Sequence, residues 1–408
     1  MQIKGTSIFA QMLTFINKNK FAKIVKEYKG DKYAKKLTCW DQLVSMMFCH
    51  LGQAKALREI CNGLKSTLGK LSHLGVRTTP VHSTLAYANA HRPYEIYRDT
   101  FFALYDTVSY AWSKVGKRKF KFKNKLFSID STIIDLCLEM FDWAHFRRKK
   151  GAVKLHLMLD HDGYLPNFAH ITDGKTSDVK ALKNDMLEEI SFPKHSIIVL
   201  DRGYNDYKLF SHWCIQEIYF VTKMKSNAVY TVTKTRSLPE NSPIIKDEEI
   251  RLTGFYSKKK CPFLLRRIEV YDEENDRVIV LLTNNMKLAA STVSRIYRDR
   301  WEIEIFFKTI KQNLKIKTFV GTTPNAVKIQ LWTALIAILL IKYLKMISSY
   351  GRWSMSNLIA LLRFNLFSYR DLIEWINNPY KEPPHLDGNG QLTLSFVGQQ
   401  GGTPILNT

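Results

Sequence analysis

The stretch from residue 126 to residue 172 contains three short apolar runs that decide the fold class: LFSID (126–130), AVKLHLMLD (152–160) and YLPNFAHIT (164–172). Each run has the length and residue types of a strand. The turn residues Asp162 and Gly163 separate the last two runs. Together they predict a three-strand meander.

After the meander, strand-like and helix-like segments alternate. The helical stretch DVKALKNDMLEEI (178–190) leads to the apolar strand SIIVLD (196–201), which is followed by a helix around residues 208–216 and the strand YFVTKMK (219–225). Strands that are first antiparallel and then alternate with helices predict a mixed α/β sheet.

The alternation is interrupted at residues 226–284. Segments such as FLLRRIEVY (263–271) and RVIVLL (277–282) alternate in polarity and show little helical periodicity. They predict an inserted β-rich subdomain. Residues 289–312 then predict one strong helix.

The two ends of the chain differ from this middle region. From Ser7 to about Tyr110 the apolar residues recur at helical spacing, which predicts an all-helical N-terminal domain at residues 1–112. The mixed α/β region is expected to span residues 120–376. Residues 377–408 contain Gly and Pro, end in GQQGGTPILNT, and are expected to be disordered.

The chain is strongly basic, because its 408 residues contain 61 Lys and Arg against 37 Asp and Glu, a formal net charge of +24. A hydrophobic content of 45% excludes global disorder, and the length excludes a single small binding module. Such a surplus attracts polyanions, which are most often nucleic acid and less often an anionic membrane surface. Composition does not choose between these two partners.

Neither membrane insertion nor secretion is expected. The longest apolar run, LWTALIAILLI (331–341), is shorter than the ~20 residues of a spanning helix, so it predicts a buried helix. The N-terminus lacks a signal-peptide pattern, and we expect the protein to stay in the cytoplasm. The six Cys residues form no CxxC pair and have no His at zinc-finger spacing, so we expect buried reduced thiols.

Two aspartates end apolar strands: Asp130 closes LFSID, and Asp201 closes SIIVLD. Strand ends are where α/β folds place reactive groups, but a single aspartate there is more often a turn or capping residue. Three other aspartates near strand ends lie in turn sequences that predict structural roles: Asp160, Asp162 and Asp173.

A third carboxylate comes from RIYRDRWEIEIFFKTIKQ (295–312). At ~100° per residue, the side chains of Tyr297, Arg300, Glu304 and Lys311 fall within about 60° of one another on a helix, whereas Glu302 points to roughly the opposite side. The helix is therefore expected to present one carboxylate among Tyr, Arg and Lys. Arg300 and Glu304 could equally form an ordinary surface ion pair.

The pattern Tyr-x2-Arg-x3-Glu-x6-Lys resembles the signature of the insertion-sequence-four family of transposases, without gap or substitution. The segments IDSTIIDLCLEMFDWAHFRRKKGAVKLHLMLDHDGYLP and VLDRGYND are similar to the first and second aspartate regions of that family. FAKIVKEY and HSTLAYANAHRP are similar to its N-terminal domain, so the resemblance covers residues 1–360. One departure is Ser177 before Asp178, where many relatives have His.

The resemblance implies a ribonuclease-H-like catalytic domain with a DDE triad of Asp130, Asp201 and Glu304. Phosphodiester cleavage of this kind uses two hard cations, Mg²⁺ or Mn²⁺, for which carboxylates are suitable ligands. The resemblance also implies that Tyr297, Arg300 and Lys311 contact the phosphates near the transposon end. Arg202 is a weaker candidate for that role and could form an ion pair instead. Trp301 could stack on a displaced base, but a place in the core is expected.

The expected function is that of a transposase, which binds terminal inverted repeats, cuts their 3′ ends and joins them to target DNA as a homodimer. The resemblance alone implies cut-and-paste transfer through hairpin ends. It also implies that the protein is associated with the nucleoid in a bacterial cytoplasm. The N-terminal region is expected to recognise the ends. The insert could hold DNA or act as a brace. A catalytically silent DNA-binding protein and a nuclease without strand transfer are the alternatives.

Overall fold

The computed structural model describes residues 5–67, 70–136, 141, 143, 145–147, 150–238, 240, 242–314, 316, 318–349 and 353–381. For residues 145–147, 150, 184 and 185 it describes the backbone only. Most of the predicted tail, residues 382–408, lies outside this range, as does Cys137.

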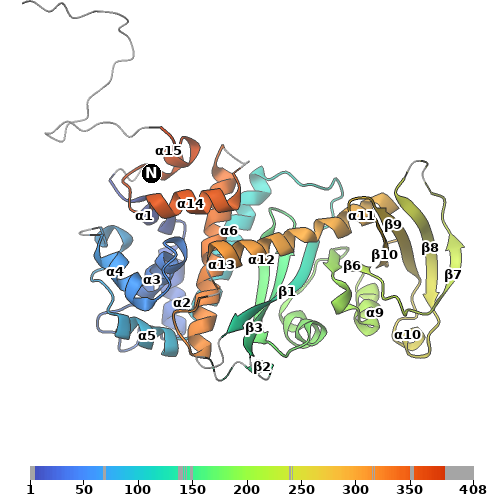
Figure 1. Cartoon of the computed structure of the whole chain (residues 1–408), viewed down its shortest axis with the longest axis horizontal. Helices are drawn as coiled ribbons and strands as arrows, with labels where there is room; N and C mark the ends of the chain where they lie inside the picture. Colours follow the sequence, from blue (N-terminus) through green and yellow to red (C-terminus); the bar gives the residue numbers. More distant parts are fainter. Residues whose placement is uncertain are drawn as a thin grey trace, which may run out of the picture.

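One large mixed sheet forms the middle of the molecule (Figure 1). Within the described residues its strands follow the order β2-β3-β1-β5-β6-β10-β9-β8-β7, and β4 also pairs with β3. The strands are β1 (Leu126–Leu136), β2 (His145–Arg147), β3 (Lys150–Asp160), β4 (Leu165–Asp173), β5 (Ile197–Leu200), β6 (Tyr219–Lys223), β7 (Tyr230–Thr235), β8 (Ile244–Leu252), β9 (Leu265–Asp272) and β10 (Arg277–Thr283).

The predicted meander and mixed sheet are both present. Strands β1, β3 and β4 pair antiparallel, while β5 pairs parallel with β1 and β6 pairs parallel with β5. The strands of the expected insert, β7 to β10, do not form a separate sheet, because β10 pairs antiparallel with β6. The insert therefore extends the same sheet.

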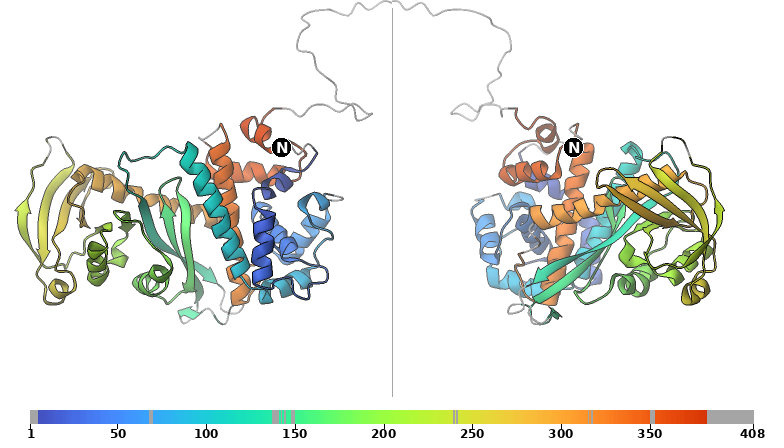
Figure 2. Two further views of the ribbon diagram at one scale, coloured as in Figure 1. Left: turned by 180° about the vertical axis from the view of Figure 1, so that it is seen from behind. Right: turned by 45° about the vertical axis from the view of Figure 1, so that its right-hand side comes forward.

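Helices from both ends of the chain lie together at one side of the sheet (Figures 1 and 2). The N-terminal ones are α1 (Ile8–Leu13), α2 (Lys18–Glu27), α3 (Cys39–Leu51), α4 (Leu57–Lys65), η1 (Ser72–Leu74), α5 (His82–His91) and α6 (Glu95–Val115). The C-terminal ones are α13 (Pro324–Ile347), α14 (Met355–Asn365) and α15 (Leu372–Asn377). Helix α13 packs against α3, α5 and α6, and the two groups share one hydrophobic core.

Helix α13 contains the longest apolar run and confirms the buried helix predicted for residues 331–341. It is the one helix of the described residues that is long and apolar enough to cross a membrane, but 83% of its apolar 18-residue window is buried inside the protein. The helix begins where Thr323 caps it and Pro324 occupies its first turn.

The remaining helices connect the strands: α7 (Asp178–Ala181), the π-helical η2 (Leu182–Met186), α8 (Leu187–Glu189), η3 (Arg202–Tyr204), α9 (Tyr207–Ile215), α10 (Phe255–Lys260), α11 (Ala290–Asp299) and α12 (Trp301–Asn313). The prediction of one helix at residues 289–312 is wrong, because α11 ends and α12 begins at Arg300. The backbone there tightens: Arg300 N–H donates to the Tyr297 carbonyl at 3.2 Å, and Ile303 N–H donates to the Arg300 carbonyl at 3.1 Å. Tyr297 and Glu304 consequently lie on different helices.

Candidate active site

Asp130 and Asp201 are brought together by the parallel pairing of β1 and β5. The register runs from Leu126 opposite Ile197 to Ile129 opposite Leu200, so the next position on each strand is an aspartate. Because the two strands run in the same direction, the two aspartates occupy adjacent positions, although β1 continues past Asp130 to Leu136 and only Asp201 stands at a strand end. Asp201 follows β5 directly and precedes η3.

Arg300 joins two of the three predicted carboxylates. Its Nη1 donates to Asp130 Oδ2 at 2.8 Å, and its Nη2 donates to Glu304 Oε1 at 2.7 Å. The Arg300 side chain is only 12% exposed, so this ion pair differs from the ordinary surface pair that the i, i+4 spacing also allowed. The junction of α11 and α12 is therefore fixed to β1 through one guanidinium group.

The carboxyl group of Asp130 has a raised pKa. Burial raises its pKa to about 6, even though the charge of Arg300 and a hydrogen bond from the Ser131 N–H act in the opposite direction. The charges of Asp201 and Glu304 raise this pKa further. The three carboxylates thus influence one another, although only two of them share Arg300.

Two hollows lie around this arrangement. The larger, of about 990 Å³, is lined by Asp201, Tyr297 and Arg300 among others. The smaller, of about 450 Å³, is lined by Asp130, Glu304 and Lys311 among others. Six of the predicted residues therefore line one or the other of these two hollows.

The predicted phosphate contacts have different surroundings. The guanidinium of Arg300 lies 5.8 Å from the ring centre of Tyr297, and Lys311 Nζ donates to the Ile133 carbonyl at 2.7 Å. Among the described residues, no hydrogen bond or ion pair joins the side chain of Arg202 to the three carboxylates, and its Nη2 donates to Ser226 Oγ at 3.0 Å. The structure thus brings Tyr297 and Lys311 to the carboxylates and leaves Arg202 at the edge.

The sequence led us to expect Trp301 in the core, but the structure places it at the surface. Its side chain is 59% exposed and lines the larger hollow. It begins α12 on the side of the helix that faces away from the buried residues Ile303 and Phe307.

The structural roles predicted for the turn aspartates are present. Lys125 Nζ donates to Asp160 at 3.0 Å and to Asp162 at 2.6 Å, and Asp173 accepts hydrogen bonds from the following turn. These residues do not join the carboxylates around Arg300.

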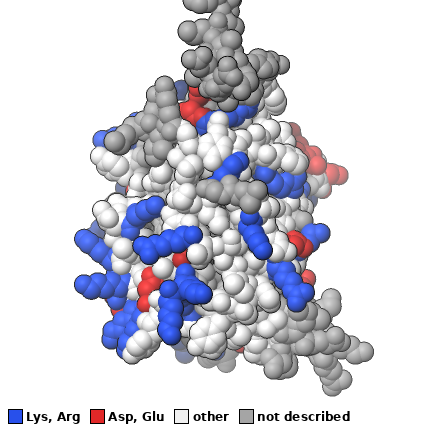
Figure 3. Space-filling model, turned by 90° about the vertical axis from the view of Figure 1, so that its left-hand side faces the viewer, with Lys and Arg blue, Asp and Glu red and all other residues white. Residues whose placement is uncertain are grey.

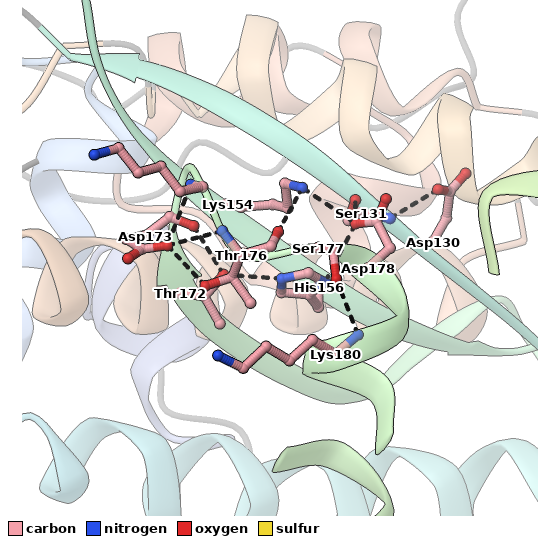
Figure 4. Close-up of polar contacts among 11 residues, drawn as sticks. Asp130, Ser131, Lys154, His156, Thr172, Asp173, Thr176, Ser177, Asp178 and Lys180 are labelled. Atoms are coloured by element: carbon pink, nitrogen blue, oxygen red, sulfur yellow. Dashed lines mark hydrogen bonds and ion pairs between the residues drawn. The ribbon is translucent and has the colours of Figure 1, made fainter. Parts of the chain in front are cut away.

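A polar cluster beside Asp130 was not predicted as functional (Figure 4). Ser131 Oγ donates to Asp178 Oδ1 at 2.6 Å, while Lys154 Nζ lies 3.4 Å from the same oxygen. Burial lowers the pKa of His156 to about 4, so this ring is neutral near pH 7, and its Nε2 lies 2.9 Å from Thr172 Oγ1. The sequence signal was the position of Asp178 after the third strand of the meander.

A second unpredicted network holds the helix junction against the sheet. The ring of His161 links Asp299, through Nδ1 at 2.7 Å from Oδ2, with Ser128, through Nε2 at 2.7 Å from Oγ. Lys119 and Tyr164 also donate to Asp299. Asp299 precedes Arg300, and Ser128 lies two residues before Asp130, so the network connects both sides of the site. All three linked side chains are buried.

The donor set suits a hard divalent cation by its chemistry. Asp130, Asp201 and Glu304 are all carboxylates, and the positive charge of Arg300 already lies between two of them. Among the described residues, no group of three or more His, Cys, Asp or Glu side chains is gathered at the spacing of a metal centre.

Comparison with known proteins identifies the family. Residues 121–340 match the family model of the transposase DDE domain, and residues 4–77 match a domain of unknown function (DUF4372). The protein y4zB of Sinorhizobium fredii, named as a transposase, is 30% identical over 317 residues, which are 75% of this chain and 83% of that protein.

A second relative is named as the transposase of insertion sequence element IS5377 of Geobacillus stearothermophilus, and is 28% identical over 64% of this chain and 67% of its own length. A solved structure of piggyBac transposase in a synaptic complex with hairpin DNA aligns with 94% of this chain and 86% of its own, at 11% identity and a TM-score of 0.41. The first family match spans more than half of the 408 residues, and the chain therefore belongs to the transposase DDE domain family, whose enzymes cleave and transfer DNA.

Proposed function

We propose that the chain is the transposase of an insertion sequence of the insertion-sequence-four type, and that Asp130, Asp201 and Glu304 form its catalytic triad. The observation that carries this proposal is the bridge from Asp130 through Arg300 to Glu304, with Asp201 at the next strand end. Three carboxylates from two strands and one helix then face open hollows beside Tyr297 and Lys311.

The sheet order supports a ribonuclease-H-like catalytic domain. A meander of β1, β3 and β4 is followed by β5 and β6, which run parallel to β1. Asp130 lies within β1 and Asp201 directly follows β5, and these two strands are neighbours in the interior of the sheet. The insert extends this sheet from β6 outward, where it could hold DNA ends or act as a brace.

Enzymes with a transposase DDE domain generally use divalent metal ions. We infer that Asp130, Asp201 and Glu304 hold two Mg²⁺ or Mn²⁺ ions in this chain. When bound, these ions would activate the attacking hydroxyl and stabilise the leaving oxygen of the phosphodiester. The protein groups do the positioning. Arg300 and Lys311 offer cationic donors to phosphate oxygens, and Tyr297 offers a hydroxyl at the rim of the larger hollow. Arg202 would reach only a more distant phosphate.

The partners that we propose are the double-stranded transposon ends and the target DNA, bound by a homodimer. The N-terminal helices would recognise the end sequence, and cut-and-paste transfer through hairpin ends remains part of the proposal. The net charge of +24 favours such a polyanion and a nucleoid-associated place in the bacterial cytoplasm.

The test incubates the purified chain with a plasmid that carries its gene and flanking DNA, with Mg²⁺, Mn²⁺ or EDTA. Cleavage at the element ends and joined products are expected with metal. Asp130→Asn, Asp201→Asn and Glu304→Gln should each lower the cleavage rate about 100-fold or more while DNA binding persists.

The matched control is Glu302→Gln, which changes the neighbouring carboxylate of α12, whose charge acts on Lys342 and Lys345. It should keep normal cleavage. Binding without cleavage in any metal would support the silent DNA-binding alternative, and cleavage without joined products would support a nuclease. Excised DNA without hairpin ends would contradict only the proposed route through hairpin ends.

A further inference from the structure

A hollow of about 790 Å³ lies between α2, the loop that follows it and the start of α3. We propose that this lysine hollow grips the phosphate backbone of duplex DNA without reading its sequence. The inference rests on the proposed function, since it names a surface by which a DNA transposase would hold its substrate. It places this contact in the part of the chain that matches a domain of unknown function.

Most of the charged residues that line the hollow are cationic. Its six exposed lysines are Lys18, Lys26, Lys29, Lys32, Lys35 and Lys36. Arg77 adds a seventh cation from the segment after η1. On the helical side of the molecule, Lys and Arg predominate over Asp and Glu (Figure 3). Cations spaced around a hollow of this kind fit a run of phosphates.

These cations are not neutralised from within the protein. In the part of the chain that the structure describes, none of the seven forms an ion pair with a carboxylate. The two aspartates of the hollow are used elsewhere: Asp31 accepts from the Cys39 N–H at 2.7 Å, and Asp41 accepts from the Thr38 N–H at 2.7 Å. These contacts hold the two carboxylates at the start of α3, and Asp31 also lies 3.8 Å from Arg92 outside the hollow. Seven cations against two carboxylates leave the hollow with an excess of positive charge for an outside anion.

Hydrogen-bonded turns and close packing tie down the loop that carries most of the rim. Lys29 and Tyr33 have positive φ angles of 52° and 65°, a region that residues other than glycine rarely adopt. Hydrogen bonds at 3.0 Å from the Lys32 and Ala34 N–H groups fix the turns. Gly30 lies so close to α6 that a Cβ there would be 2.4 Å from Ile96 Cδ1. Lysines on a loop tied down in this way would lose less backbone entropy on binding than lysines on an untied loop.

The floor of the hollow explains why phosphates, and not bases, are the ligand. Trp40 already donates its Nε1–H to the Leu74 carbonyl at 2.8 Å, and Lys18 Nζ covers its ring at 4.9 Å from the centre. Phe21 packs against the same ring. The aromatic groups are therefore occupied, and the accessible chemistry is positive charge. Contacts of this type position a duplex but carry no sequence information.

The test measures the affinity of the full chain for short duplexes as a function of salt concentration, using DNA from the element flanks and random DNA. In the triple variant Lys32→Ala/Lys35→Ala/Lys36→Ala, the slope of log affinity against log salt should fall by roughly 0.9 for each phosphate that the variant no longer neutralises. The affinity ratio between flank and random DNA should stay the same.

The matched control, Lys20→Ala/Lys194→Ala/Lys381→Ala, removes the same charge from three lysines that are ion-paired within the protein, to Asp106, Glu217 and Glu374. It should keep a normal slope. Thermal unfolding of both variants checks that they fold.

Equal slopes for the two triple variants would overturn the proposal, as would a weaker preference for flank DNA with an unchanged slope. If the triple lysine variant no longer bound vesicles of anionic phospholipid but bound DNA normally, the proposal would be overturned in favour of a membrane surface. The slope could fall in the triple lysine variant as expected while the unmodified chain never cleaves DNA. In that case the proposed function would be wrong, but the role of the lysine hollow in DNA binding would be supported.

Discussion

The guanidinium of Arg300 balances two carboxylates that would otherwise repel each other. Its planar fork contacts Asp130 with one nitrogen and Glu304 with the other, while its Nε has no partner among the described residues. A metal ion held by the same carboxylates would compete with this contact. Arg300 would then be released toward a phosphate.

We therefore predict opposite effects of Arg300→Gln on metal binding and on catalysis. Without the competing charge, Mn²⁺ should raise the melting temperature of the variant by a few degrees more than that of the unmodified chain. The cleavage rate should nevertheless fall about 10-fold or more, because the phosphate has one cationic donor fewer. The checks are thermal unfolding across a Mn²⁺ series and single-turnover cleavage. An equal or smaller Mn²⁺ effect would argue against competition.

The residues around Arg300 show what could be predicted from the sequence. Asp201 follows β5 and Glu304 lies on the face of a helix, as local patterns predicted, whereas Asp130 is not the strand end that was expected, because β1 continues beyond it to Leu136. Ser128, His161 and Asp299 meet only because the fold brings distant segments together, and neither the spacing nor the residue types indicate that contact.

Exposure also depends on distant neighbours. The core is the expected place for Trp301 because large aromatic residues usually lie there, yet the neighbouring elements leave it 59% exposed.

At the scale of elements, the position of α12 depends on its junction with α11. Burial would raise the pKa of Asp299, but the hydrogen bonds from His161 and Lys119 hold this pKa below its ordinary value, so the carboxylate remains charged. The charged side chain fixes the residue before Arg300 to the end of β3 and to β1.

Asp299→Asn and His161→Gln should each slow cleavage about 10-fold or more without weakening DNA binding, because small displacements of a catalytic group are costly. The measurement is the single-turnover rate with saturating protein. The control is Asp247→Asn, which breaks another buried pair, with Arg266 in the insert, and should lower the melting temperature but leave the rate unchanged below it. Equal rates for all three variants and the unmodified chain would contradict a positioning role.

At the scale of the whole molecule, the ends of the chain depend on each other. The Ile8 N–H donates to the Ser368 carbonyl at 3.1 Å, and the Phe9 N–H donates to the Leu366 carbonyl at 2.8 Å. Sequence patterns located most of the strands and helices because periodicity is local, but they missed the break at Arg300 and the continuation of β1 to Leu136. They grouped α13 with the sheet, whereas it also packs on α3, α5 and α6. The domain boundary between residues 112 and 120 stays a prediction.

A fragment that starts at Lys117 should not fold on its own, because it would expose the apolar face of α13. We expect it to aggregate, or to bind a hydrophobic dye and unfold without a cooperative transition. Co-expression of residues 1–116 as a separate chain should restore a soluble complex. A cooperative thermal transition of the fragment alone would contradict this view.

The core shared by the two ends has a consequence for synthesis of the protein. A ribosome adds about 5–20 residues each second, so the first helices wait many seconds before α13 leaves the exit tunnel. During that interval their apolar faces need a chaperone or a transient partner. Translation that stops before residue 324 should therefore yield a product that is degraded, and not a shortened protein that occupies DNA.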